Sequence, residues 1–448
     1  MGVENIEKHS FRFSVLKVWM QFWHNKIFYR KVVYVHKEKV PLQDHLIFTA
    51  NHQNALMDAL AVEFSFKNQF VFVARSDIFK KKFIARILYF LKILPVYRIR
   101  DGYESLRKNE MVFKKTLDII RNKNGFVILP EGNHAGFRRL RALKKGFARI
   151  AFQAEETSGF SLDIKIVPVG INYSNYENIR SDLLVVFGDA FSVSEFYEVY
   201  QAHPAKAYNL IKAKLSERLK PLMVHINSPF YDVYDFLRKA YRNEACRQMQ
   251  LNPLALYDRF KAEKDIIARL KRFETKEPEA MERLAAGVKE YDNLLKKMKL
   301  QDTKPVSVFS LLGKKLLLLV ASPLFLYGYV NNLFPWYIAT LYPGKIKDPQ
   351  FRSSVKFALS SLSFPLFYLI QTLVVFLLFH QPWLTLTYFV SLPLSAAIAW
   401  NYAKLFHRFI LGWRYLKRSL SKDAMLLKTR ELYPELLAEM DRIFRNYK

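Results

Sequence analysis

Cysteine is almost absent from this chain, which has 448 residues and the single cysteine Cys246. One cysteine excludes an intramolecular disulfide and a metal cage built from thiolates. The sequence also lacks a Gly-x-Ser-x-Gly element, the sharp turn that presents a nucleophilic serine. Cys246 itself lies in a highly charged stretch. We therefore expect chemistry without a covalent intermediate on serine or cysteine.

Acidic residues are scarce: 40 Asp and Glu stand against 70 Lys and Arg, a net charge of +30. Such an excess suits nucleic acid or an anionic membrane surface. No nucleic-acid-binding motif accompanies it, and the aromatic residues, 15% of the chain, cluster in apolar stretches. We therefore expect membrane lipid, and no nucleic acid, as a partner. The N-terminus MGVENIEKHS has no early apolar core, so no signal peptide is expected.

Long charge-free runs are present between residues 304 and 420, which we interpret as a membrane region. Phe357–Phe379 has 23 residues and Trp383–Trp400 has 18, with His380-Gln381-Pro382 as a turn between them. A span needs roughly 20 apolar residues, so these two predict a membrane hairpin. Leu316–Leu341 is also free of charge.

Leu316–Leu341 is predicted to dip into the membrane and return, as a re-entrant segment. It contains Asn331, Asn332 and Pro335, where we expect a break. Positive residues flank it on both sides, which favours both ends on the cytoplasmic face. They are Lys304, Lys314 and Lys315 before it, and Lys345, Lys347, Arg352 and Lys356 after it.

The N-terminal region 1–31 is predicted to hold an amphipathic helix that lies in the membrane interface. Bulky residues recur at helical spacing with polar residues between them. The bulky set is Leu16, Trp19, Met20, Trp23 and Ile27, and the polar set is Lys17, Gln21, Asn25 and Arg30. A helix that covers the domain core is the alternative.

Residues 32–225 alternate strand-like runs with helical patterns, which predicts an α/β fold with a sheet and flanking helices. The helical pattern Leu106–Asn122 ends at Asn124-Gly125, a typical stop signal. The expected strands are 32–35, 46–50, 70–73, 126–129, 164–169 and 183–187.

Residues 226–303 are charged and helical, and residues 421–448 read as a charged helical tail. Pro253 and Pro278 divide the first region into separate helices. A heptad seam of apolar residues runs along the last of them; it consists of Met281, Leu284, Val288, Tyr291, Leu295 and Met298. We expect a helical insert without chemistry.

The residues best suited to acid–base chemistry lie in the segment 51–58, NHQNALMD, which follows the apolar run Leu46–Ala50. A neutral imidazole whose tautomer is fixed by a carboxylate can take a proton from an alcohol near pH 7. His52 and Asp58 have five residues between them, and positions i and i+6 lie on different sides of a helix. His52 must therefore sit in the turn before a helix that carries Asp58 early.

Further polar groups lie near the end of another predicted strand. Ile128–Asn133 reads ILPEGN, Lys144-Lys145-Gly146 comes soon after it, and Pro95–Arg100 reads PVYRIR before it. Several cations near one candidate base suggest a site for a phosphorylated alcohol. His134 has no second His or Cys at ligand spacing, so no metal is expected.

These blocks resemble the glycerolipid (phospholipid/glycerol) acyltransferase family, the glycerol-3-phosphate and 1-acyl-glycerol-3-phosphate O-acyltransferases. The resemblance covers four blocks in family order, over roughly half of the chain. They are NHQNALMD at 51–58, the stretch 75–100 that ends in PVYRIR, LPEGN at 129–133 with LKKG at 143–146, and IVPVGIN at 166–172. The spacing departs from the usual pattern, which has four residues between the histidine and the aspartate.

The resemblance implies a role for each candidate residue. His52 would be the general base and Asp58 the residue that orients it. Arg98, with Glu131 and Gly132, would form the acceptor site, where the guanidinium grips phosphate and the carboxylate orients hydroxyls or a nearby cation. Arg100, Lys144 and Lys145 would extend the cationic pocket, with surface solvation as the alternative. Strand 166–170 would wall the acyl pocket or simply pack the core.

The sequence as a whole predicts an integral membrane O-acyltransferase with its active site on the cytoplasmic face. It would move a fatty acyl group from acyl-CoA or acyl-carrier protein to glycerol 3-phosphate or 1-acyl-glycerol 3-phosphate, without a cofactor. One alternative is an acyltransferase for another lysolipid or an aminoacyl lipid. The other is a catalytically inactive, lipid-binding membrane scaffold.

Overall fold

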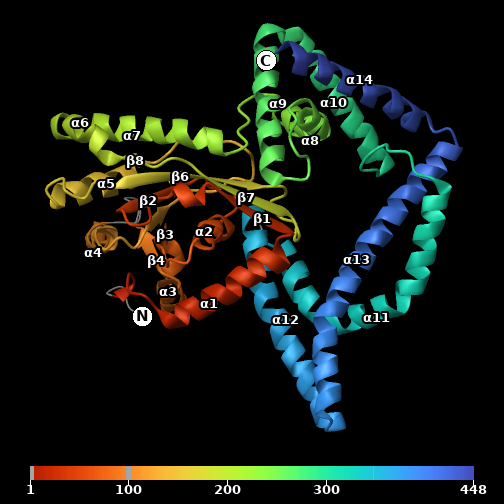
Figure 1. Cartoon of the computed structure of the whole chain (residues 1–448), viewed down its shortest axis with the longest axis horizontal. Helices are drawn as coiled ribbons and strands as arrows, with labels where there is room; N and C mark the ends of the chain where they lie inside the picture. Colours follow the sequence, from red (N-terminus) through yellow and green to blue (C-terminus); the bar gives the residue numbers. More distant parts are fainter. Residues whose placement is uncertain (1–4, 97–102, 347, 448) are drawn as a thin grey trace. The chain divides into compact units, whose positions relative to one another are not determined.

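A computed structural model describes residues 5–96, 103–346 and 348–447 of the chain. The chain forms two compact units (Figure 1). The first unit, which we call the catalytic unit after the candidate residues His52 and Asp58 that it contains, comprises residues 1–225 together with 346–357. The second, the helical unit, comprises 226–345 and 358–448. The short stretch 346–357 therefore joins a unit whose other residues end more than a hundred positions earlier.

The catalytic unit is built on an eight-stranded mixed sheet with the order β1-β7-β6-β2-β5-β3-β4, in which β8 pairs with β6. β2 lies parallel to both β5 and β6, while β7 and β8 run antiparallel to β6. The strands are β1 Lys31–Val35, β2 Leu46–Ala50, β3 Val71–Arg75, β4 Ile93–Val96, β5 Phe126–Ile128, β6 Lys165–Tyr173, β7 Asp182–Phe187 and β8 Phe191–Ser192.

The α/β fold class is confirmed, and all six predicted strands are present. The sequence missed β8, which has only two residues, and β4. β4 follows an amphipathic helix directly and contains Pro95, a residue that sheets tolerate at an edge. β4 is in fact the edge strand.

Helices cover both faces of the central strand β2, all five residues of which are buried. Ile47 belongs to a core cluster with Phe147, Phe152 and Ile211 of the flanking helices. Phe48 packs against Phe70 instead, because successive side chains of a strand point to opposite faces. Burial on both sides explains the continuous apolar run of this strand.

The helices of the catalytic unit are mostly short. They are α1 Phe11–Phe22, α2 Leu56–Glu63, α3 Lys82–Phe90, α4 Tyr103–Arg121, α5 Gly146–Thr157, α6 Tyr197–Ala202 and α7 Pro204–Leu219. A π-helix, η2 Trp23–Phe28, continues α1. The described residues of this unit also include the 3₁₀ turns η3 Lys37–Lys39, η4 Ser76–Phe79, η6 Val193–Phe196 and η7 Lys220–Leu222.

The amphipathic pattern expected for α1 is wrong in detail. Lys17, expected on the polar face, is buried in an ion pair with Glu63, and Trp23 is buried as well. The helix is apolar around most of its circumference, so spacing alone does not identify its outer face. The exposed apolar residues are Phe11, Val15, Val18, Trp19 and Phe22.

The charged part of the helical unit consists of α8 Tyr231–Gln248, α9 Leu256–Lys276, α10 Pro278–Met298 and the tail helix α14 Ala424–Asn446. The helices end and begin near Pro253 and Pro278, as predicted. All six residues of the predicted heptad seam are buried in α10. Tyr241 on α8 donates a hydrogen bond to Asp441 on α14, so the tail packs on these helices.

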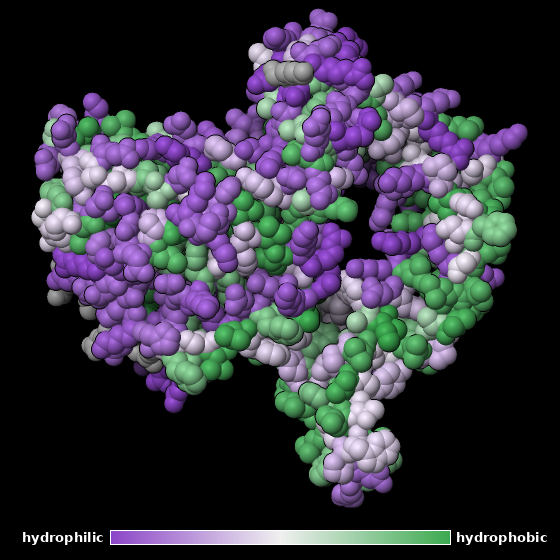
Figure 2. Space-filling view, in the orientation of Figure 1, coloured by the Kyte–Doolittle hydropathy of each residue, from purple (hydrophilic) through white to green (hydrophobic). Residues whose placement is uncertain are grey.

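Among the described residues, three helices are long and apolar enough to cross a membrane. They are α11 Val308–Gly344, α12 Pro349–Phe379 and α13 Pro382–Leu420. Figure 2 shows apolar residues over much of their surface, and the exposed side chains of α12 include Leu369, Leu373 and Leu377. The predicted hairpin turn at His380–Pro382 separates α12 from α13.

The expected break in Leu316–Leu341 is not present, because α11 is helical from Val308 to Gly344. It is bent along its length (Figure 1) and contains Pro323, Pro335 and Pro343, and prolines kink helices. The amides of Asn331 and Asn332 donate to carbonyls one turn earlier, those of Tyr327 and Gly328, at 2.8 Å each. The helix thus satisfies the polar groups that were expected to break it.

Neighbouring helices complete this polar cluster. Pro335 has no N–H to offer the Asn331 carbonyl four residues earlier, and Gln371 Nε2 of α12 donates to that carbonyl at 2.9 Å. Tyr388 and Tyr368 donate to the side-chain oxygens of Asn331 and Asn332, each at 2.6 Å. Internal partners for polar groups are what a lipid environment demands.

Candidate active site

The candidate site lies at the carboxyl ends of three adjacent strands, β2, β5 and β6. Open α/β sheets bind ligands at this edge, because loops rather than strands continue the chain there. His52 follows β2, Glu131 follows β5, and Tyr173 is the last residue of β6. Asn51 fastens β2 to β6: its side-chain amide donates to the Ile171 carbonyl and accepts from the Ile171 N–H.

The turn between β2 and α2 brings His52 and Asp58 together. His52 lies in the turn and Asp58 in the first turn of α2, as the spacing required. Ala55, just before the helix, has a φ of +45°, a backbone conformation that L residues rarely adopt. This sharp reversal folds the turn back over the helix start, so that His52 Nδ1 lies 2.9 Å from Asp58 Oδ2.

Asp58 is fully buried and held by four donors. Oδ2 accepts from the backbone N–H groups of Gln53 and Asn54, at 2.7 Å each, besides its contact with His52. Oδ1 accepts from the Tyr173 hydroxyl at 2.9 Å. The carboxylate also lies at a helix N-terminus, where negative charge is favoured. Hydrogen bonds therefore compensate for the loss of solvent around this charge.

The contacts of Asp58 assign the tautomer of His52. An ionised carboxylate can only accept hydrogen bonds, so Nδ1 of His52 carries the proton and donates it to Oδ2. In the neutral ring, Nε2 then bears the lone pair. The His52 side chain is 14% exposed, so the ring can be reached although most of it is covered. This is the state that a general base requires.

Glu131 braces the turn from the neighbouring strand. Its Oε1 accepts from the backbone N–H of His52 at 2.7 Å, and its Oε2 accepts from the backbone N–H and Nε of Arg141. Burial raises the pKa of Glu131, partly opposed by these hydrogen bonds and by the charge of Arg141. Of the two partners considered for Glu131, a hydroxyl or a nearby cation, the structure provides a cation in Arg141.

Gly132 and Lys144 lie side by side. Gly132 has a φ of +67°, and a Cβ at this position would lie 3.3 Å from Cγ of Lys144. The Lys144 N–H donates to the Pro130 carbonyl at 2.7 Å, which ties the two loops together. The side chain of Lys144 is exposed and that of Lys145, at the N-cap of α5, is half-buried.

Arg98 and Arg100 lie outside the described residues, so the expected phosphate contact of PVYRIR stays a prediction. The strand expected to wall the acyl pocket is β6, where Pro168, Val169 and Gly170 are buried. The backbone of Leu222 lies against Gly170 so closely that a Cβ there would be 2.0 Å from the Leu222 oxygen. This part of β6 therefore packs the core.

Sequence reasoning missed several residues around His52. Tyr173 directly follows the IVPVGIN block, and the need of a buried tyrosine hydroxyl for a partner could have drawn attention to it. His134 was considered only as a metal ligand, yet its ring lies 5.4 Å from that of His52, edge to face. Nothing in the sequence marked Asp348 and Ser353 as site residues, because they lie far along the chain from their partners His134 and Asn54.

The chain matches one protein-family model, described as Acyltransferase, over residues 31–172. No curated protein matches it. Among solved structures it is similar to the crystal structure of the 1-acyl-sn-glycerophosphate (LPA) acyltransferase PlsC from Thermotoga maritima. The two chains share 16% identity with a TM-score of 0.31, over 48% of this chain and 78% of the other. At that TM-score the likeness supports no further argument. The matched residues 31–172 run from β1 to β6 and include His52, Asp58 and Glu131.

Proposed function

We propose that this chain, whose residues 31–172 match the acyltransferase family model, acylates a glycerophosphate alcohol at a membrane. The donor is a fatty acyl thioester, acyl-CoA or acyl-carrier protein. The acceptor is glycerol 3-phosphate or 1-acyl-glycerol 3-phosphate. The observation that carries the proposal is the His52–Asp58 pair at the end of β2, within the family-matched region.

His52 acts as the general base of the transfer. An alcohol is a poor nucleophile because its proton leaves only at high pH. Nε2 of His52 takes this proton as the oxygen attacks the thioester carbonyl, a contribution of about 10²–10⁴-fold. The tetrahedral intermediate then collapses with loss of the thiolate, which takes the proton from the His52 imidazolium and leaves as the thiol. Asp58 holds the ring and stabilises the imidazolium that forms.

The acceptor side supplies positive charge for the phosphate. Arg98, Arg100, Lys144 and Lys145 are the cations that we assign to it, and the place of Lys144 beside Gly132 supports this assignment. Glu131 supports the turn that carries His52, and Gly132 lies against Lys144. A phosphate dianion held here would bring the neighbouring hydroxyl to His52 in a fixed orientation.

The three long apolar helices indicate an association with membrane. We assign the active site to the cytoplasmic face, because positive residues flank the membrane region. Among them are Lys304 before α11 and Lys404 and Arg408 in α13. Acyl thioesters of coenzyme A or carrier protein are polar and bulky, and a site on this face would meet them without transport.

The proposal is tested on membranes that contain the full-length protein. Labelled acyl-CoA or acyl-carrier protein is offered with each glycerophosphate acceptor, for the wild type, His52→Ala and the matched control His203→Ala, an exposed histidine of the same unit. We expect transfer by the wild type and the control, and a loss of about 10²-fold or more in His52→Ala. No transfer to either acceptor, or a His52→Ala variant as active as the control, would refute the proposal.

A further inference from the structure

Residues 348–357, which we call the return segment, belong to the catalytic unit although they follow the long apolar helix α11 in the sequence. They include the first turns of α12, which begins at Pro349. The family match ends at residue 172 and does not include them. Their contacts converge on the loops that surround His52.

The first contact is made by Asp348. Its Oδ2 lies 3.0 Å from Nε2 of His134, whose ring in turn lies 5.4 Å from the ring of His52. The ring of Phe351 packs against His134 from another direction, at 4.8 Å and 90°. The side chain of His134 is 10% exposed, so the return segment covers this histidine and fixes its orientation.

The second contact is made by Ser353, which is 1% exposed. Its hydroxyl donates to Oδ1 of Asn54 at 2.6 Å. The backbone N–H of Asn54 donates to Asp58 Oδ2, the oxygen that holds His52. Three hydrogen bonds, which pass through Asn54 and Asp58, thus connect Ser353 to His52.

Further contacts fasten the same segment to the same unit. Arg352 pairs with the Glu177 carboxylate at 3.4 Å, and Lys356 donates to the Glu177 carbonyl at 3.1 Å. Phe357 is fully buried and meets the ring of Phe28 at 5.5 Å. These polar contacts and the buried aromatic side chain hold the return segment against the rest of the catalytic unit.

We propose that the return segment completes the acceptor site, with Asp348 as a positioning residue that acts through His134. Ser353 is a second positioning residue, which acts through Asn54. The inference rests on the proposed function and deepens it. The acyltransferase domain then extends beyond its family-matched part, and its last component is supplied by the start of a membrane helix.

The chemistry of the His134–Asp348 pair suits the polar end of the acceptor. A carboxylate only accepts, so Nε2 of His134 carries the proton shared with Asp348. Nδ1 then bears the lone pair and can accept a hydrogen bond from a hydroxyl of the acceptor beside His52. Without Asp348 the ring would be free to rotate, and a misplacement of about 1 Å costs on the order of 10²-fold in rate.

The first test is a double-mutant cycle on the full-length enzyme in membranes. Asp348→Ala and His134→Ala are each expected to lower kcat/KM for the acceptor by on the order of 10²-fold, with the KM for the acyl donor nearly unchanged. If Asp348 acts through His134, the double variant is no worse than either single variant. Asp189→Asn, at an exposed aspartate of the same unit, is the control. Additive losses, or an Asp348→Ala variant within twofold of the control, would overturn the inference.

The second test does not depend on activity. Diethyl pyrocarbonate modifies accessible imidazoles, and peptide mapping measures the modification rate of His52 against that of the exposed His203. We expect a severalfold faster reaction of His52 in Asp348→Ala and Ser353→Ala, at an unchanged unfolding temperature, and no change in the control Ser161→Ala. Unchanged His52 rates would overturn the inference while leaving the proposed function intact. A wild type without acyl transfer would refute the proposed function, and these rates would still decide whether the segment covers His52.

Discussion

At the scale of single residues, Asp58 is the point on which the site depends. It accepts from four donors within one buried volume, and three of those donors come from the turn that carries His52. A change that removes the Asp58 carboxylate therefore affects both the orientation of the His52 ring and the shape of the turn. The two effects are separable, because Tyr173 contacts Asp58 without belonging to the turn.

Tyr173→Phe and Asp58→Asn should differ in severity. The first change removes one hydrogen bond to a buried carboxylate, worth about 1.5–3 kcal/mol, so we expect kcat to fall roughly 10-fold to 100-fold. The second replaces a carboxylate by an amide that cannot accept from all of its donors, and should cost more. Tyr200→Phe, a buried tyrosine bonded to Glu156, is the control. A Tyr173→Phe enzyme with wild-type kcat would contradict this account of Asp58.

The dyad was predictable because its residues are close in sequence and share one pattern. His52, Asp58 and the turn between them form a local unit, so the spacing alone specified a histidine before a helix. The contacts of His134 with Asp348 and of Asn54 with Ser353 join residues 214 and 299 positions apart. Nothing local marks such partners, since a serine or an aspartate at a helix start is a common cap.

At the scale of elements, α1 is attached to the domain by a buried charge pair. Lys17 Nζ lies 2.8 Å from Glu63 at the end of α2, and Lys92 is buried nearby with its ammonium on the carbonyls of Ile6 and Lys8. Burial raises the pKa of Glu63 to about 7, although Lys17 opposes the shift. α1 is thus connected to the helix that carries Asp58.

This shifted pKa predicts a pH dependence of stability. The pKa of Glu63 rises from 4.5 when unfolded to about 7 when folded, so the folded state binds the proton more tightly. The tighter proton binding of Glu63 therefore adds to the free energy of unfolding in full below pH 4.5, and this contribution is lost as the pH rises towards 7. The loss is at most about 3 kcal/mol. Thermal unfolding of the detergent-solubilised protein should show a flatter profile across this window in Glu63→Gln than in wild type or Glu198→Gln. Parallel profiles would count against the assignment.

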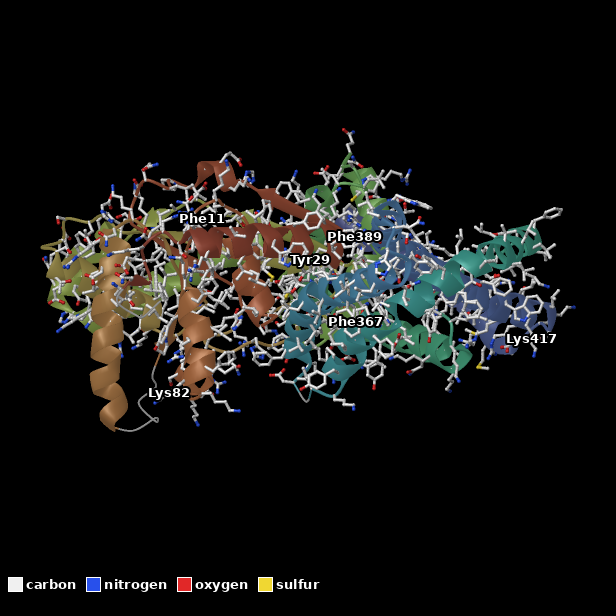
Figure 3. The ribbon with its side chains drawn as sticks, turned by 90° about the horizontal axis from the view of Figure 1, so that it is seen from below. Phe11, Tyr29, Lys82, Phe367, Phe389 and Lys417 are labelled. Atoms are coloured by element: carbon white, nitrogen blue, oxygen red, sulfur yellow. The ribbon has the colours of Figure 1, made fainter. Side chains whose placement is uncertain are left out.

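A second feature of α1 is the apolar surface that it forms together with α3. Phe13 of α1 meets Phe90 of α3 at 6.2 Å. On the outside, Phe11 and Phe83 are 77% and 72% exposed. Lys80, Lys81, Lys82 and Arg86 surround Phe83 and are exposed too. Figure 3 shows Phe11 and Lys82 on these two helices. Apolar residues beside cations are typical of a surface that enters an anionic bilayer.

We expect this surface to touch lipid in the full-length protein. Nitroxide labels at Val18→Cys and Phe83→Cys, in a Cys246→Ser background reconstituted in anionic vesicles, should collide with oxygen more often than with a water-soluble nickel chelate. A label at Lys206→Cys, at an exposed position on α7, should show the reverse. Labels at 18 and 83 that resemble the one at 206 would show that the catalytic unit does not dock through these helices.

At the scale of the whole molecule, the path of the chain restricts how α11 can meet the membrane. In the part of the chain that the structure describes, the span-length apolar helices are α11, α12 and α13, so the start of α11 follows the catalytic unit without an intervening span. The end of α11 leads into residues 346–357, which belong to the catalytic unit again. Both ends of α11 are therefore expected on one side. Its length would allow a crossing, whereas the connections favour a bent helix that enters and returns.

Cysteine labelling tests this topology. In a Cys246→Ser background, Lys345→Cys and Gln381→Cys are treated in intact cells with a membrane-impermeant maleimide. We expect only position 381, in the hairpin turn, to react, because both ends of α11 are expected on one side of the membrane and the hairpin turn on the other. Permeabilised cells, in which both positions should react, provide the control. Labelling of 345 in intact cells would show that α11 crosses the bilayer.

The sequence predicted that the molecule has two parts. It did not predict that residues 346–357 return to the first part. Composition separates an α/β region from charge-free runs, and each run became a helix because lipid-facing positions are apolar on all sides. The break expected at Asn331 and Asn332 failed for a tertiary reason. Tyr388 and Tyr368 supply partners from other helices, and no local pattern encodes those contacts.

The place of the return segment has a consequence for biosynthesis. A ribosome releases the strands and the His52 turn early, while residues 348–357 emerge only after all of α11 has been made. Until then His134 and Asn54 lack their partners Asp348 and Ser353. A nascent chain that has not yet delivered α11 to the bilayer would thus carry an open, poorly ordered site. The order of synthesis would keep the site incomplete in the aqueous phase until α11 has been made and can reach the bilayer.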